Sequence, residues 1–151
     1  MSIVMYLLAV LMMVIVDQAV KYWAVTMLAS IGTIPLISGV LSLTYVENRG
    51  AAFSILEKQI WLFVALAVVI LCGIVYALKT DKIQAPMLVI AAGAIGNVID
   101  RVVNHYVVDM IQLEFIRFPI FNIADIYVCV GVALFAFYYL FIHKDAEEAD
   151  K

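Results

Sequence analysis

The chain has 151 residues, a mean hydropathy of +1.11 and only 14% charged residues, whereas an ordinary soluble domain carries about 25%. These values exclude an ordinary soluble domain and predict one integral-membrane unit over residues 1–151. A net charge of −3 without any basic run argues against a nucleic-acid partner.

The first apolar run predicts a membrane span over residues 3–28. Asp17 and Lys21 fall in its last third, four residues apart, which is the favourable spacing for a helical ion pair. Two interpretations stay open. In the preferred one the two charges neutralise each other near the membrane interface, with Lys21 reaching toward water; in the other they lie close to a functional site.

Residues 30–58 change in character and predict a small β-element. Turn-forming residues open the segment, and residues 40–46 alternate in hydropathy as a strand does. An unpaired strand is not viable in lipid, so this segment is expected outside the hydrocarbon layer. Near its end Asn48 offers both hydrogen-bond donors and acceptors, and Gly50 allows a tight turn or a close backbone approach.

Three further spans are predicted over residues 60–78, 87–103 and 121–142. The span 87–103 is rich in alanine and glycine, which predicts close approach to another helix. Room for a ligand is the functional alternative, and the two are compatible. Four spans place both termini on one side and residues 30–58 on the other. Lysine and arginine are almost evenly divided between the two sides, so their count does not orient the chain.

Polar residues gather at the end of the span 87–103 and beyond it. Asn97, Asp100 and Arg101 lie three or four residues apart and so share one helical face. Asp100 and Arg101 can form a structural ion pair at the helix end; alternatively, Arg101 orients a substrate carbonyl while Asp100 holds the fold. The second interpretation is preferred.

Two aspartates near membrane depth are the strongest functional candidates, because charge is costly there. Asp109 is expected at the end of the span 87–103 or just past it, before a connector through residue 119. Asp125 lies in the first turn of the last span, on one face with Asn122. Two carboxyls brought together tend to share one proton, and such a pair can activate water and protonate a leaving group.

Other chemistries find less support. The chain has no HExxH motif, and its two histidines, His105 and His143, are expected on opposite sides of the membrane, so no metal is predicted. It also has no G-x-S-x-G motif for a serine nucleophile. The sequence therefore favours a carboxylate mechanism that needs no cofactor.

At this point the chain resembles a known family, the bacterial lipoprotein (type II) signal peptidases. Five motifs carry the resemblance in order: DQAVK at 17–21, NRGAAF at 48–53, GNVIDR at 96–101, VVDM at 107–110 and FNIAD at 121–125. In the family the fourth motif usually ends in an aromatic residue, and here Met110 stands in its place. Methionine is a flexible filler, so altered packing beside Asp109 is expected without loss of activity.

The resemblance implies that Asp109 and Asp125 are the catalytic pair. The other matching positions would line or support the site: Asn48, Gly50, Asn97, Arg101, Asn122 and Ala124, with Asp17, Lys21 and Asp100 nearby.

The resemblance also implies a fold of four transmembrane helices with a small extracytoplasmic β-cradle, in the bacterial cytoplasmic membrane and with cytoplasmic termini. The implied reaction removes the signal peptide from a diacylglyceryl-modified prolipoprotein, on the N-terminal side of the lipidated cysteine. Membrane lipid and inhibitors of the globomycin type are the other implied partners, and a monomer is expected.

Two other classes compete with the peptidase. A small transporter or proton channel would require acids distributed across the membrane, whereas Asp109 and Asp125 are expected at one face and residues 60–78 hold no polar relay. A structural or assembly protein would leave the grouped asparagine, aspartate and arginine residues without a role.

Overall fold

The computed structural model describes residues 3–50 and 85–143. It also describes a few positions between 65 and 76, and each of those few positions is helical. Most of the predicted span 60–78 therefore lies outside the described residues, as does the end of the predicted β-segment, 51–58.

The described helices follow the predicted spans closely. They are α1 (Ile3–Trp23), continued by the π-helical η1 (Ala24–Leu28) and the short α2 (Ala29–Ile31), then α4 (Ala85–Val103), and α5 (Ile123–Phe137), continued by the π-helical η3 (Tyr138–His143). Three stretches of the described residues are long and apolar enough to cross a membrane: Val4–Ile31, Ala85–Val103 and Ile123–Phe141. The predicted spans 3–28, 87–103 and 121–142 are thereby confirmed as apolar helices to within a few residues.

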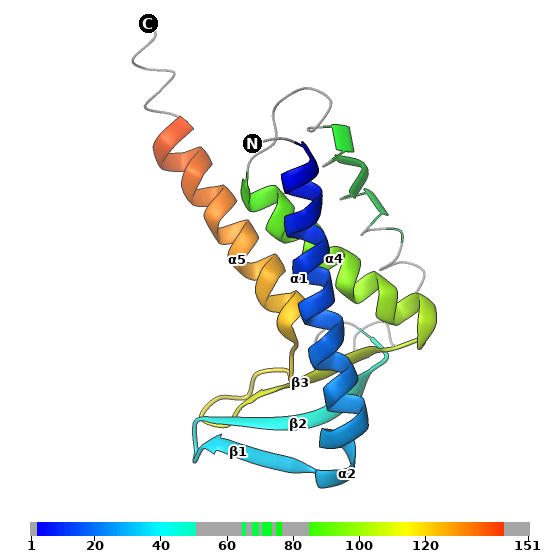
Figure 1. Cartoon of the computed structure of the whole chain (residues 1–151). Coiled ribbons are helices and arrows are strands. Elements are labelled where there is room, and N and C mark those ends of the chain that lie inside the picture. The colour runs from blue at the N-terminus through cyan, green and yellow to red at the C-terminus, as the bar shows by residue number, and fades with distance from the viewer. Residues whose placement is uncertain are drawn as a thin grey trace, which may run out of the picture.

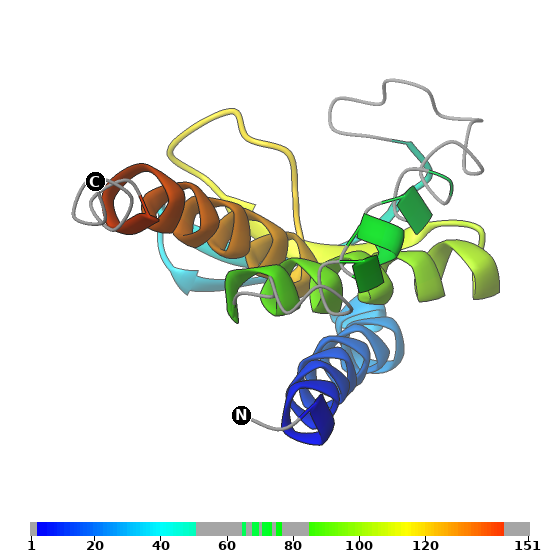
Figure 2. The ribbon, with the colours of Figure 1, turned by 90° about the horizontal axis from the view of Figure 1, so that it is seen from above.

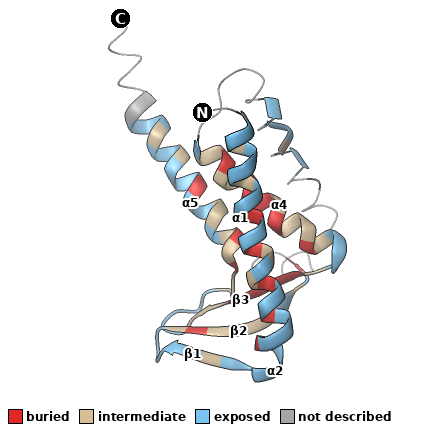
Figure 3. Cartoon of the chain, viewed as in Figure 1, coloured by how far each residue is buried: buried red, intermediate tan, exposed pale blue. Residues whose placement is uncertain are grey.

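Most of the first helix is exposed, as expected for a surface that faces lipid (Figure 3). Its buried residues form one stripe, at Val14, Asp17, Lys21, Ala24 and Leu28. The spacing of three and four residues places this stripe on a single helical face. The stripe carries an acid and a base at its centre, so Asp17 and Lys21 point into the protein.

Helices α4 and α5 approach each other closely through small residues. A Cβ atom added to Gly93 would collide with the carbonyl oxygen of Ala124, and one added to Gly96 would collide with the carboxylate of Asp17. The predicted role of the alanine- and glycine-rich stretch is therefore confirmed. At Gly96 the same close approach brings α4 against a charged group of α1.

The β-element is a three-stranded antiparallel sheet in the order β1 (Thr33–Ile37), β2 (Leu41–Asn48) and β3 (Val107–Leu113). The first two strands confirm the prediction for residues 30–58 as far as it is described. The third corrects it: residues 107–113 form a strand, where the sequence analysis expected a span end and a connector. Residues 107–110 are all buried, so the strand lacks the alternating pattern that identifies one-sided strands.

The sheet lies across one end of the three helices (Figure 1). Helices α1 and α4 begin at the opposite end of the helical bundle and run toward the sheet, whereas α5 runs away from it. Seen from above, the sheet extends beneath the helices (Figure 2). The described buried residues concentrate where the helices meet the sheet (Figure 3).

Candidate active site

Asp109 lies in β3 with only 1% of its surface exposed. Its two carboxylate oxygens accept hydrogen bonds from different elements: Oδ2 from the amide of Asn48 in β2 at 2.8 Å, and Oδ1 from the amide of Asn122 at 2.7 Å. Burial raises the pKa of Asp109 to about 6; the charge of Asp125 adds to this rise, and the two asparagine hydrogen bonds oppose it. This carboxyl therefore exchanges its proton close to neutral pH.

Asp125 occupies the first turn of α5, where Asn122 is the N-cap. The Oδ1 atom of Asn122 accepts the N–H of Asp125 at 3.0 Å, and Oδ2 of Asp125 accepts the N–H of Asn122 at 3.2 Å. This reciprocal capping box confirms that the two residues share one face. The remaining oxygen, Oδ1 of Asp125, accepts the amide of Asn97 at 2.8 Å.

Three asparagines thus point their amide NH₂ groups at the two aspartates. Each amide is held in that orientation because its oxygen faces a group that only donates hydrogen bonds. These donors are the N–H of Gly50 for Asn48 (3.1 Å), the ammonium of Lys21 for Asn97 (3.0 Å) and the N–H of Asp125 for Asn122 (3.0 Å).

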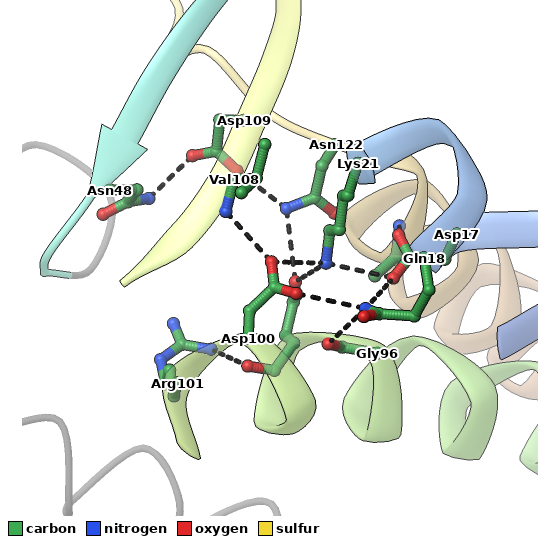
Figure 4. Close-up of polar contacts among 12 residues, drawn as sticks. Asp17, Gln18, Lys21, Asn48, Gly96, Asp100, Arg101, Val108, Asp109 and Asn122 are labelled. Carbon is green, nitrogen blue, oxygen red and sulfur yellow. Dashed lines mark hydrogen bonds and ion pairs between the residues drawn. The ribbon is translucent and has the colours of Figure 1, made fainter. Parts of the chain in front are cut away.

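Asn97 contacts a buried charge cluster through Lys21, which lies between Asp17 and Asp100 (Figure 4). The ammonium is 3.0 Å from Oδ2 of Asp17 and 3.1 Å from Oδ2 of Asp100, and its side chain is only 3% exposed. The predicted Asp17–Lys21 pair is confirmed, but the expectation that Lys21 reaches toward water is wrong. Three acceptors inside the protein satisfy its ammonium, so the side chain turns inward.

Gln18 belongs to this cluster and was missed by the sequence analysis. Its Nε2 atom lies within hydrogen-bond distance of Asp17 (3.2 Å), Asp100 (3.1 Å) and the carbonyl of Gly96 (3.2 Å). Adjacent helical residues point about 100° apart, so a neighbour of Asp17 is not expected on the same face. The length of the glutamine side chain overcomes that angle.

Asp100 and Arg101 make hydrogen bonds to different groups. Besides Lys21, Asp100 accepts the backbone N–H of Val108 at 3.0 Å, which favours the structural interpretation of this aspartate. The guanidinium of Arg101 is half-buried and donates to the carbonyl of Asn97 at 3.3 Å. Its charge interacts most strongly with Asp125, less with Asp109 and least with Asp100. Arg101 therefore lies on the side of α4 that faces the two aspartates.

The remaining predicted positions are packed into the same region. Ala124 is fully buried, and its backbone N–H donates to Oδ1 of Asp17 at 3.0 Å. Gly50 is buried beside Asn48. Met110 is 1% exposed and belongs to an apolar cluster with Leu28, so it acts as a core filler next to Asp109.

Comparison with known proteins gives concordant results. The family model described as "Signal peptidase (SPase) II" matches residues 9–141. The chain is 44% identical over 135 residues to the lipoprotein signal peptidases of Streptococcus pyogenes serotypes M6 and M5, covering 86% of this chain and 89% of each relative. Two solved structures of a bacterial membrane enzyme, at 2.3 and 1.9 Å resolution, have TM-scores of 0.84 and 0.83 at 34% identity. They cover 91% and 93% of this chain, and this chain covers 88% and 95% of theirs.

Proposed function

Because the chain belongs to the signal peptidase II family, aspartic peptidases that cleave signal peptides from prolipoproteins, we propose that Asp109 and Asp125 are its catalytic pair. The chain is an aspartic endopeptidase of the bacterial membrane.

One observation carries the assignment: three asparagine amides from different parts of the chain converge on two carboxylates. Asp109 and Asp125 come from a strand and a helix, yet Asn122 touches both. Amide donors stabilise carboxylates without neutralising their charge, so the two carboxyls can still accept and donate protons.

The two aspartates differ in surroundings, and this difference suggests their roles. Asp109 is buried and has a raised pKa, so it is the member that holds the shared proton. Asp125 is half-buried and accepts N–H groups on both oxygens, which suits the ionised form. Asp125 takes a proton from water as the water oxygen attacks the scissile carbonyl carbon. Asp109 hydrogen-bonds the carbonyl oxygen and then protonates the leaving amine, and proton return from Asp125 restores the pair.

Arg101 is the candidate for binding a substrate carbonyl. It is a cation on the α4 face next to the catalytic pair, and a guanidinium stabilises negative charge that develops on an oxygen. A peptide bond beside a lipidated cysteine would reach this point from the membrane, with its acyl chains remaining in lipid. The proposed cleavage is on the N-terminal side of the diacylglyceryl-cysteine, as the resemblance to the family implies.

The proposed topology has four spans, cytoplasmic termini and an extracytoplasmic sheet. Strand β2 lies at the sheet end of the molecule, whereas α4 begins at the opposite end (Figure 1). This geometry supports the predicted span 60–78. A reporter that is active only in the cytoplasm, fused to the C-terminus, tests this orientation and should be active. An inactive reporter would mean that the orientation is the opposite of the proposed one.

The decisive test is cleavage of a diacylglyceryl-modified prolipoprotein by the purified chain in detergent, followed by a gel shift. Asp109→Asn and Asp125→Asn should each reduce kcat at least about 1,000-fold while folding normally, because each removes half of the proton-transfer device. A metal chelator and globomycin serve as controls, with inhibition expected from globomycin alone. Near wild-type cleavage by either folded variant would refute the assignment.

A further inference from the structure

Two aspartates outside the proposed catalytic pair each hold the backbone immediately before a member of that pair. Asp17 accepts the N–H of Ala124, the residue before Asp125, at 3.0 Å. Asp100 accepts the N–H of Val108, the residue before Asp109, at 3.0 Å. The same contact thus occurs twice, once at the start of a helix and once in a strand.

One cation joins these two contacts. The ammonium of Lys21 lies 3.0 Å from Asp17 and 3.1 Å from Asp100, so it fixes the two acids relative to each other (Figure 4). Its third contact is the Oδ1 atom of Asn97, 3.0 Å away, which turns the amide of Asn97 toward Asp125. An ammonium has three donors, and all three are in use.

Burial makes this arrangement stiff. Asp17, Lys21 and Asp100 are between 0% and 3% exposed, so water has little access with which to replace any of these contacts. Gln18 provides a second bridge between the same two acids. Charged hydrogen bonds in such surroundings are short and directional, and breaking one leaves an uncompensated charge.

We propose that Lys21, through Asp17 and Asp100, is the positioning residue that sets the separation and orientation of Asp109 and Asp125. Lys21 hydrogen-bonds neither of the two directly; it acts on the backbone before each of them and on the amide of Asn97. The inference rests on the proposed catalytic pair. It predicts that loss of Lys21 affects the chemical step more than substrate binding.

The test compares four variants of the full chain in detergent, using the prolipoprotein assay, thermal melts and kinetics per folded enzyme. Lys21→Met removes the cation, and Lys21→Arg keeps it. The double variant Asp17→Asn with Lys21→Met removes one charge of each sign, which limits the destabilisation that an unpaired buried charge causes. Thr26→Val is the matched control, because Thr26 is exposed on the same helical stretch and hydrogen-bonds only carbonyls of that stretch.

Lys21→Met and the double variant should lower kcat about 100-fold with KM within about threefold of wild type, since misplacement of catalytic groups by about 1 Å costs that much. Lys21→Arg, which keeps the positive charge, should have a kcat at least about tenfold higher than that of Lys21→Met. Thr26→Val should match wild type. A folded Lys21→Met or double variant with kcat within threefold of wild type overturns the proposal. Failure of both variants to fold also overturns it, because the cluster would then be required for folding and not for positioning the catalytic pair.

Asp109→Asn and Asp125→Asn run in the same assay. If they retain activity, the catalytic pair is wrong; if they are inactive while the Lys21 variants cleave normally, only the positioning role fails.

Discussion

Within the part of the chain that the structure describes, two ion-pair clusters of similar geometry lie in very different surroundings. In the helical bundle Lys21 lies 3.0 Å from Asp17 with both side chains at 3% exposure or less. On the sheet Arg49 lies 2.8 Å from Glu47, with exposures of 65% and 37%, and its guanidinium also rests 5.6 Å from the centre of the Tyr106 ring.

Distance alone would rank the sheet pair as the stronger, but solvent reverses that order. Water and salt screen an exposed pair, and both of its partners remain solvated when one is removed. A buried pair has no such alternative, so loss of one partner leaves a charge without compensation. Burial, and not contact length, therefore decides which cluster the fold depends on.

The largest effect is expected where the buried cluster loses an acid. Asp100→Ala leaves Lys21 with one anion fewer and leaves the N–H of Val108 without its acceptor. Loss of one partner of a buried pair costs about 3–5 kcal/mol, so the melting temperature in detergent should fall by roughly 10 °C.

Asp100→Asn is the matched control, because its amide oxygen can still accept the N–H of Val108. It should melt between wild type and Asp100→Ala. If Asp100→Ala melts within about 2 °C of wild type, the fold does not depend on the buried cluster as strongly as its burial implies.

A smaller effect is expected at Asn48, the last residue of β2, which contacts Asp109. Its neighbours in the chain, Glu47 and Arg49, face solvent, whereas its own amide donates to Asp109. This hydrogen bond stabilises the charged carboxylate and so opposes the rise in the pKa of Asp109, which burial brings to about 6. Asn48→Ala should therefore raise that pKa further.

The sign of the change in activity follows from the proposed role of Asp109. If Asp109 must hold a proton, kcat/KM of the wild type falls as the pH rises through its pKa of about 6. In Asn48→Ala this descending limb should move to higher pH by about one pH unit, the scale of a hydrogen bond to a charged group. Glu47→Gln, one residue away, should leave it in place. If the descending limb of the kcat/KM profile has the same pH midpoint in Asn48→Ala as in wild type, Asp109 does not hold the proton.

Local spacing explains which parts of the site were predictable from the sequence. Asn122 with Asp125, and Asp17 with Lys21, lie three and four residues apart, and helical geometry alone places each pair on one face. The position of each described span could likewise be predicted from local sequence, because it follows from the length of an apolar run. These predictions required no knowledge of how distant segments pack.

The missed features depend on contacts between distant segments. Strand β3 pairs with β2, and the paired residues lie between 59 (Asn48 with Val107) and 72 (Leu41 with Leu113) positions apart. The buried run 107–110 has no alternating pattern to reveal the strand. The inward turn of Lys21 depends on Asp100 and Asn97, which a helix far along the chain supplies. The contact between Asp17 and Ala124 joins residues 107 positions apart. Composition and periodicity hold no information about such pairings.

The smallest effect is expected at the exposed cluster. The hydrogen bond from Arg49 lowers the pKa of Glu47, but both groups are open to solvent, so Arg49→Gln should leave the melting temperature unchanged within error. Any residual difference should vanish in about 1 M salt, where the screening length is only about 3 Å. Lys21→Gln, measured beside it, should melt well below wild type at both salt concentrations. Equal destabilisation by the two substitutions would mean that contact geometry outweighs burial in this fold.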